Sequence, residues 1–138
     1  MTPGYSSRTL VEKLGVKAGT RVALVGAPDG FEAALEPLPD GARTVRRLSK
    51  GVEMAVMFST SRAELARRWP DLTAAVGPNG GVWVAWPKRA SGVPTDMTED
   101  VVREVVLPTG WVDIKVIAVD DTWSGLRCAL RRELRPGS

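Results

Sequence analysis

The stretch R-V-A-L-V-G-A-P-D-G-F, residues 21–31, decides how the rest of the chain is interpreted. A compact apolar run ends at Gly26, and Gly30 immediately precedes a segment with the composition of a short helix. An apolar run of this length between turn signals is typical of a strand buried on both faces. The glycine turn between this strand and the helix is either a phosphate-binding nucleotide loop or only the turn that an α/β fold requires.

Strand-like and helix-like segments alternate along most of the chain. The apolar patterns predict strands at residues 21–26, 42–48, 53–60, 81–86, 112–119 and 125–130, and helices at residues 6–15, 31–38, 61–76 and 96–106. Alternation favours a parallel sheet covered by helices on its faces, and two strands joined by a short loop favour an antiparallel hairpin. The sequence therefore predicts an α/β fold: a single three-layer Rossmann-like domain over residues 1–138, with a mostly parallel sheet of five to six strands and a C-terminal antiparallel hairpin.

Three sequence signals concern the helices. Ser61 and Glu64 have the spacing of a capping box at the start of the third predicted helix. Pro70 lies inside that helix and is expected to kink or divide it, because proline has no N–H to donate. Asp96 and Glu99 offer a second cap, for the last predicted helix.

Residues 43–58 allow two arrangements. Only the four residues 49–52 separate the second predicted strand from the third. A parallel crossover normally takes about a dozen or more residues. Either the second strand is very short, or residues 43–58 form a hairpin.

Composition excludes several classes of function. The chain has 138 residues, a formal net charge of +3 and no histidine. Without histidine there is no Ser-His or Cys-His couple, and most zinc sites are excluded, so no metal site is predicted. No apolar run approaches the ~18 residues of a membrane span. Together with the single Cys128, this predicts a cytoplasmic protein without disulfides.

Two segments carry a resemblance to class I methyltransferases. The stretch K-L-G-V-K-A-G-T-R-V-A-L-V-G-A-P-D-G resembles their entry, where a glycine precedes a first strand that ends in a Gly-x-Gly-x-Gly loop. G-P-N-G-G-V-W-V-A-W-P-K is similar to a later turn and strand end of that fold, and the closing hairpin is another of its features. Taken whole, the chain resembles a small bacterial family classified only as a domain of unknown function, through residues 22–35, 61–65, 80–88, 90–105 and 120–127.

The cofactor loop departs from the methyltransferase pattern. The three loop glycines of the resemblance fall on Gly26, Pro28 and Gly30, and proline brings a ring and no N–H to the middle position. The acid inside the first methyltransferase strand falls on Leu24. The acid expected after the second strand has no counterpart in residues 45–50, which are basic and offer no acceptor to ribose hydroxyls. The two arginines there suit a 2′-phosphate instead.

Polar segments follow the predicted strands at one edge of the sheet. Open parallel sheets place ligands beyond the carboxyl ends of their strands, and the turn before the last strand belongs to the same edge. Gly26, Pro28, Asp29 and Gly30 are therefore the candidate cofactor loop. The further ligand-binding candidates are Ser59, Ser61, Lys88, Arg89, Ser91, Asp120, Asp121 and Trp123.

Each candidate also has a structural role available to it. Ser59 and Ser61 suit helix capping, Asp120 and Asp121 suit a turn that ends a strand, and Trp123 suits packing on the hairpin. Lys88 and Arg89 suit solvated loop charge. If the chain is an enzyme, we expect a deep pocket at this edge on which Lys88, Arg89, Asp121 and Trp123 converge.

Three functions remain open at this point. The first is a non-catalytic binding or regulatory module without a cofactor, which takes a small anionic ligand or a protein partner at the strand edge. It is preferred because of Pro28, the missing acids and the missing histidine.

The second function is an S-adenosylmethionine-dependent methyltransferase or another nucleotide-ligand enzyme. In it Asp29, Asp120 or Asp121 contacts ligand hydroxyls, and Lys88 or Arg89 holds a carboxylate or phosphate. The third is weak nucleic-acid binding through arginine pairs such as Arg131 and Arg132. Nucleic acid is the least expected partner, because acids are interspersed among the basic pairs.

Overall fold

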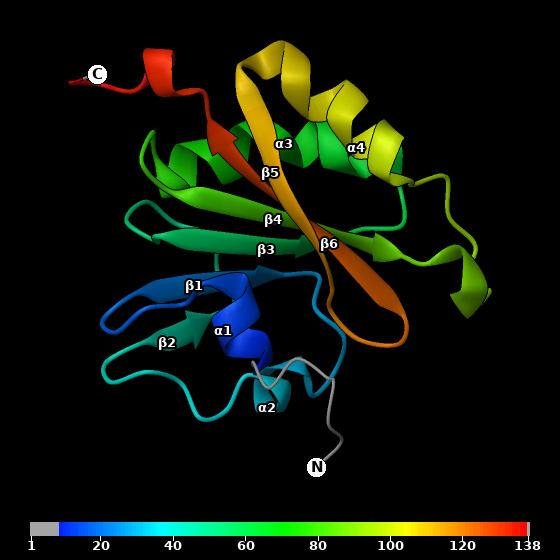
Figure 1. The fold of residues 1–138 in the computed structure, drawn as a ribbon, viewed down its shortest axis with the longest axis horizontal. Helices are drawn as coiled ribbons and strands as arrows, with labels where there is room; N and C mark the ends of the chain where they lie inside the picture. The colour runs from blue at the N-terminus through cyan, green and yellow to red at the C-terminus, as the bar shows by residue number, and fades with distance from the viewer. Residues whose placement is uncertain (1–8, 138) are drawn as a thin grey trace.

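A computed structural model describes residues 9–137 and contains one six-stranded sheet (Figure 1). The strands are β1 (Arg21–Val25), β2 (Arg43–Val45), β3 (Met54–Phe58), β4 (Gly81–Pro87), β5 (Trp111–Ala118) and β6 (Trp123–Leu130). Their order in the sheet is β2-β1-β3-β4-β6-β5. The first four run parallel, and β6 is antiparallel to both β4 and β5. The predicted mostly parallel sheet with a closing hairpin is confirmed.

Helices cover both faces of the sheet. The helices are α1 (Leu10–Leu14), α2 (Phe31–Ala34), α3 (Arg62–Val76) and α4 (Glu99–Val106). Helices α1 and α2 pack against one face, and α3 and α4 pack against the other, which confirms the three predicted layers (Figure 1). None of the helices within residues 9–137 combines the length and the apolar character needed to cross a membrane.

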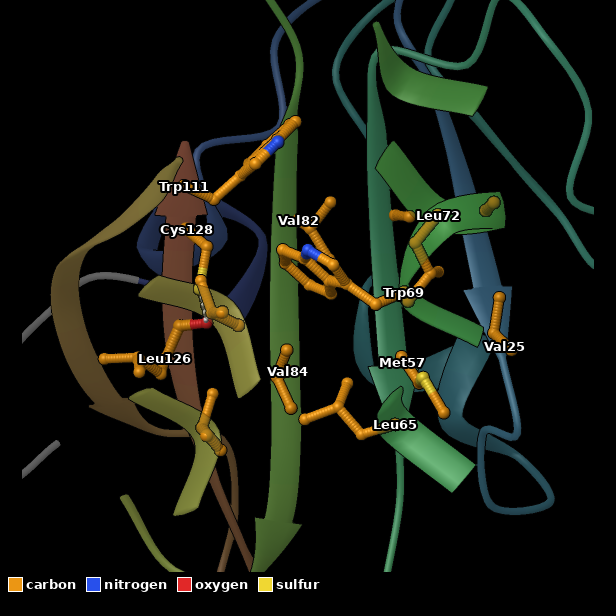
Figure 2. Close-up of a cluster of buried hydrophobic side chains, with 14 of the residues drawn as sticks. Val25, Met57, Leu65, Trp69, Leu72, Val82, Val84, Trp111, Leu126 and Cys128 are labelled. Carbon is orange, nitrogen blue, oxygen red and sulfur yellow. Dashed lines mark hydrogen bonds between the residues drawn. The ribbon is translucent and has the colours of Figure 1, made fainter. Parts of the chain in front are cut away.

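The larger core lies between the sheet and the two long helices. Leu65 and Trp69 of α3 meet Met57 and Val84 of the central strands, as Figure 2 shows. The indole rings of Trp69 and Trp111 meet edge to face, with centroids 5.7 Å apart. This core packs α3 against β3 and β4 and packs α4 against β5 and β6, and so fixes the loops that lead into both helices.

The opposite core is smaller and contains Trp83. The side chain of Trp83 is buried against α1, and its indole N–H donates to the carbonyl oxygen of Leu14 at 3.0 Å. Its neighbours Val82 and Val84 face the α3–α4 side instead. Alternation along this strand was predicted to place Trp83 in sheet packing, and that prediction is confirmed.

Each of the two long helices differs from the prediction at one point. Ser61 accepts from the backbone N–H of Glu64, as expected for an N-cap, but α3 runs without interruption across Pro70. Helix α4 is capped by Thr98 rather than by Asp96. Asp96 instead accepts from the backbone N–H of the first residue of α3, at 2.8 Å. One carboxylate therefore ties the loop before α4 to the start of α3.

The structure answers the question left open over residues 43–58. Strand β2 has only three residues and pairs in parallel with β1, with Arg43 opposite Arg21. Residues 46–53 then cross to the start of β3, where the backbone N–H of Gly51 donates to the carbonyl of Ala75 in α3. A very short edge strand with a short crossover is the arrangement that occurs, and the hairpin does not.

The other edge of the sheet is irregular. Strand β5 pairs with β6 on one side only, and its register shifts between Asp113 and Lys115. Ile114 is the extra residue at this bulge, and it is 52% exposed. Arg103 of α4 forms ion pairs with Asp113 and Glu99, which join this strand to the helix layer.

Candidate functional site at the carboxyl ends of the strands

The loop after β1 is held close to the next strand. Gly26 has a φ of +69°, and a Cβ at this position would stand 2.9 Å from the carbonyl oxygen of Phe58. Both observations require glycine, because other residues rarely adopt this φ and because the backbone oxygen cannot move far. The first glycine of the loop therefore fixes the path of the chain between β1 and β3.

The second half of the loop is open to solvent. The backbone N–H of Phe31 donates to the carbonyl of Pro28 at 3.1 Å, which closes a turn around Asp29 and Gly30. Gly30 has a φ of +81°, and a Cβ there would meet no atom within 4 Å. Asp29 is exposed beside it. This part of the loop therefore leaves room for a ligand above the backbone.

The serines after β3 organise the start of α3. Ser59 is 2% exposed, and its hydroxyl lies 2.9 Å from the carbonyl oxygen of Ser61 and accepts from the Ser61 N–H at 3.1 Å. The hydroxyl of Ser61 accepts from the N–H of Glu64. Both side chains thus have hydrogen-bond partners within their own loop, and a ligand contact by either remains a prediction.

An open groove follows the end of β4, and we call it the edge groove. It has a volume of about 580 Å³ and lies between β4, the start of β6 and the start of α4. Lys88 and Arg89 line it together with Trp86 and Met97. Ser91 is not part of its lining, and the Ser91 hydroxyl donates to the carbonyl of Lys88 at 2.7 Å. Two cations therefore lie beside apolar side chains in one concave surface.

The turn between β5 and β6 also reaches this edge. The backbone N–H of Lys88 donates to the carbonyl of Thr122 at 2.7 Å. Asp120 accepts from the backbone N–H groups of Thr122 and Trp123, both at 2.8 Å, and so holds the turn. Asp121 is exposed. One of the two carboxylates thus has a structural partner in this turn.

Three aromatic rings cross the edge on the side of α2. Trp123 meets Phe58 edge to face with centroids 5.1 Å apart, and Phe58 meets Phe31 in the same manner at 4.8 Å. The row joins the start of β6 to the end of β3 and the start of α2. Trp123 therefore packs against Phe58 on the α2 side of the sheet and lies outside the lining of the edge groove.

The four residues expected to converge on one pocket do not all do so. Lys88 and Arg89 line the edge groove, whereas Asp121 and Trp123 do not. The antiparallel turn places Trp123 over Phe58, on the opposite side of the sheet from Met97. The strand edge is thus divided into a loop with open space above it and a separate groove with two cations.

An ion pair that the sequence did not reveal lies beside the loop. Glu32, in the first turn of α2, has its Oε2 atom 2.5 Å from an Nη atom of Arg46, which directly follows β2. The Glu32 side chain is 31% exposed. The only signal for this ion pair in the sequence was Glu32 itself, an acid two residues after the loop. Its partner Arg46 could not be identified, because the pairing of β2 with β1 brings the two side chains together. A carboxylate is therefore present near the end of β2, although β2 itself supplies none.

Within residues 9–137 no group of three or more metal-ligating side chains comes together. The acceptors near the loop are the carboxylates of Asp29 and Glu32, and the donors are backbone N–H groups. Such a set suits an organic ligand with hydroxyl and amine groups.

Several solved structures similar to this one are methyltransferases. An S-adenosylmethionine-dependent methyltransferase from Aquifex aeolicus matches with a TM-score of 0.62 at 15% identity, over 86% of each chain. An O-methyltransferase from neocarzinostatin biosynthesis, in complex with S-adenosylmethionine and 2-hydroxy-5-methyl naphthoic acid, matches with a TM-score of 0.62 at 14% identity. That match covers 81% of this chain and 49% of the other. No protein-family model and no curated protein matches the sequence.

The fold is therefore a methyltransferase-like Rossmann fold, as the resemblance in the sequence implied. The preferred function, a non-catalytic binding or regulatory module, is contradicted by these neighbours, which favour the methyltransferase alternative. That expectation gave too much weight to Pro28 and to the missing acid after β2. Gly26 and Gly30 both keep positive φ angles around Pro28, and Glu32 brings a carboxylate to the end of β2.

Proposed function

We propose that this protein is an S-adenosylmethionine-dependent methyltransferase that binds its cofactor at the loop after β1. The observation that carries the proposal is the open turn at Gly30, at the end of the first strand of a methyltransferase-like sheet. Two of the three glycine positions of the resemblance are occupied by glycine. The backbone can therefore approach a ligand closely at Gly30, where no side chain fills the space.

The carboxylates of Asp29 and Glu32 are the proposed acceptors for ligand hydroxyls. A ribose needs acceptors for its two hydroxyl donors, and arginine provides none. Arg46 orients the Glu32 carboxylate at the end of β2 through their ion pair. We expect one oxygen of Glu32 to remain with Arg46 while the other accepts from the ligand, since a carboxylate has two oxygens and several lone pairs.

The edge groove is the proposed site of the methyl acceptor. Lys88 and Arg89 favour an anion, and Trp86 and Met97 favour an apolar body. The naphthoic acid ligand of the similar O-methyltransferase combines these two properties. The class of acceptor that suits this groove is therefore a small aromatic or apolar molecule with a carboxylate or a phenolate.

The two cations also suit the chemistry of the acceptor. S-adenosylmethionine supplies a methyl group on a sulfonium, which passes to a nucleophile and leaves neutral S-adenosylhomocysteine. The chain contains no histidine to serve as a general base. Lys88 and Arg89 can make a general base unnecessary, because a nearby positive charge lowers the pKa of a phenol, which then binds as the phenolate. Desolvation by the apolar side chains keeps that nucleophile reactive.

Calorimetric titration with S-adenosylmethionine and S-adenosylhomocysteine tests the cofactor site. We expect a dissociation constant in about the micromolar range, worth ~8 kcal/mol. The variants Asp29→Asn and Glu32→Gln should each weaken binding by about tenfold, since each removes a charged acceptor worth roughly 1.5–3 kcal/mol at most.

Glu133→Gln is the matched control, because Glu133 lies in the 3-10 helix Arg132–Leu134, near the other end of the chain. It should bind both ligands as the parent protein does. Absence of binding by the parent at about millimolar ligand, where affinity is worth only ~4 kcal/mol, would contradict the proposed function. Equal losses in Glu133→Gln and Glu32→Gln would contradict the role of Glu32 alone.

A further inference from the structure

A second concave surface, which we call the basic groove, lies beside the crossover segment that follows β2. It has a volume of about 700 Å³, and its walls are the crossover segment 46–50 and the flank of α3. Four cationic side chains line it: Arg46, Arg47, Lys50 and Arg68. Asp71 is the only acidic residue of the lining. Its volume is within the range of about 300–1,000 Å³ usual for small-molecule sites.

Three of these cations have no carboxylate partner in the described part of the chain. Arg46 pairs with Glu32, whereas Arg47, Lys50 and Arg68 take part in no ion pair within residues 9–137. Their positive charges therefore repel one another across the groove. Arg67, the neighbour of Arg68 in sequence, has an acidic partner in Glu64 and lies outside the lining. Of these two neighbouring arginines of α3, Arg68 therefore adds an unpaired positive charge to the groove, and Arg67 does not.

The arrangement of the cations suits a compact anion. Arg47 and Lys50 come from one wall, and Arg68 comes from the facing wall, so positive charge approaches the same space from two sides. A nucleic acid requires instead a basic stripe that continues along the surface. Here the surface of α3 next to the groove carries both signs, with Glu64 and Arg67, and Asp71 adds a negative charge to the lining itself. An anion with several charges in a small volume matches this pattern best.

We propose that the basic groove binds a polyphosphate group, carried either by inorganic polyphosphate or by a nucleoside triphosphate. A chain of two or three phosphates carries about three or more negative charges, which can face the cations of both walls. Arginine matches phosphate oxygens with paired N–H donors, and lysine adds a point charge. This site is separate from the edge groove, and it shares one residue with the proposed cofactor site, because Arg46 of its lining also pairs with Glu32.

Titration with tripolyphosphate tests the proposal. We expect saturable binding that weakens by about tenfold or more as ionic strength rises from about 0.05 to 0.5 M, because exposed charges are screened. Arg47→Gln and Arg68→Gln should each weaken it at least about threefold, and Asp71→Asn should strengthen it by about two- to fivefold. The opposite signs separate an effect of charge from an effect on folding.

Arg67→Gln is the matched control, since it removes the same charge from the adjacent position of α3, outside the groove. It should bind tripolyphosphate as the parent protein does. Tighter binding of a nucleoside triphosphate than of tripolyphosphate would identify a nucleotide as the source of the phosphates, and equal binding would identify the polyphosphate alone. No saturable binding, equal losses in Arg67→Gln and Arg68→Gln, or binding of an oligouridylate without tripolyphosphate binding would overturn the proposal.

Discussion

The two loop glycines show how one residue type has two different roles a few positions apart. Both Gly26 and Gly30 have positive φ angles, so both spare the chain the strain that a side chain would bring there. Only Gly26 is also required by a close approach, to the carbonyl oxygen of Phe58. Gly30 faces open space. The first glycine therefore belongs to the fold, and the second remains available to a ligand.

Replacement by alanine should separate these roles. Gly30→Ala should lower the free energy of unfolding by about 1 kcal/mol, from backbone strain alone. Gly26→Ala should lower it by more than about 2 kcal/mol, because the new methyl group also meets the carbonyl oxygen of Phe58 at 2.9 Å. Urea unfolding of the two variants and the parent protein measures the difference. Equal losses would show that the close approach to Phe58 is not a constraint.

At the scale of elements, α3 contains a proline in its interior, where proline is normally unfavourable. Pro70 lies inside an uninterrupted helix of 15 residues, and its side chain is exposed. The position lacks one backbone hydrogen bond to the preceding turn. What keeps α3 continuous is its packing, since Leu65, Trp69 and Leu72 are all buried against the sheet. Tertiary contacts thus outweigh the local preference for a break.

Pro70→Ala should therefore stabilise the protein. We expect the free energy of unfolding to rise by about 1–3 kcal/mol, because alanine restores the missing N–H and has the higher helix propensity. Pro78→Ala is the matched control: Pro78 is exposed and follows the end of α3, so its replacement should bring no gain. Thermal and urea unfolding measure both. A gain in Pro78→Ala as large as that in Pro70→Ala would contradict the explanation.

At the scale of the whole molecule, the titration of one buried thiol reports on global unfolding. Burial in the core beside α4, with a smaller contribution from the negative charge of Asp113, raises the pKa of Cys128 from 9.0 to about 12. The folded state therefore favours the neutral thiol. The stability from this group is complete below the unfolded pKa near 9 and is lost as the pH rises through about 12.

We expect the free energy of unfolding to fall by about 1.4 kcal/mol per pH unit from this group between pH 9 and 12. The quantity to measure is the difference in the free energy of unfolding between the parent protein and Cys128→Ala, because it isolates the contribution of this thiol. Urea midpoints taken at several pH values from 7 upward provide it. If the free energy of unfolding changed with pH in the same way in both proteins, the pKa of Cys128 would not be raised in the folded state.

Much of the fold could be predicted from the sequence, because each buried strand leaves a local pattern. The apolar runs of β1, β3 and β4 are buried along almost their whole length, and Trp83 alternates with Val82 and Val84 as expected. The choice between a very short β2 and a hairpin over residues 43–58 stayed open in the sequence, because a three-residue strand is defined by its partner. The cap of α4 was misplaced for a related reason, since Asp96 serves α3 through a contact between distant segments.

The site was predicted only in part. The direction of the strands brings the candidate segments to one edge of the sheet. Side-chain packing then decides which of their residues line the same groove. Trp123 packs on Phe58, and Lys88 lines the edge groove on the other side. The pairing of Glu32 with Arg46 depends on the register of β2 against β1, which no periodicity encodes. The basic groove likewise requires the crossover and α3 to face each other.

The irregular edges of the sheet bear on what happens when many copies of the chain meet. An exposed strand with free N–H and C=O groups is a template for a strand of another molecule, and long flat edges of this kind lead to aggregation. Here one edge offers only the three residues of β2, and the other is broken at Ile114 by the bulge in β5. Neither edge presents a straight run of pairing groups. The molecule therefore carries its own protection against fibril-like stacking at high concentration.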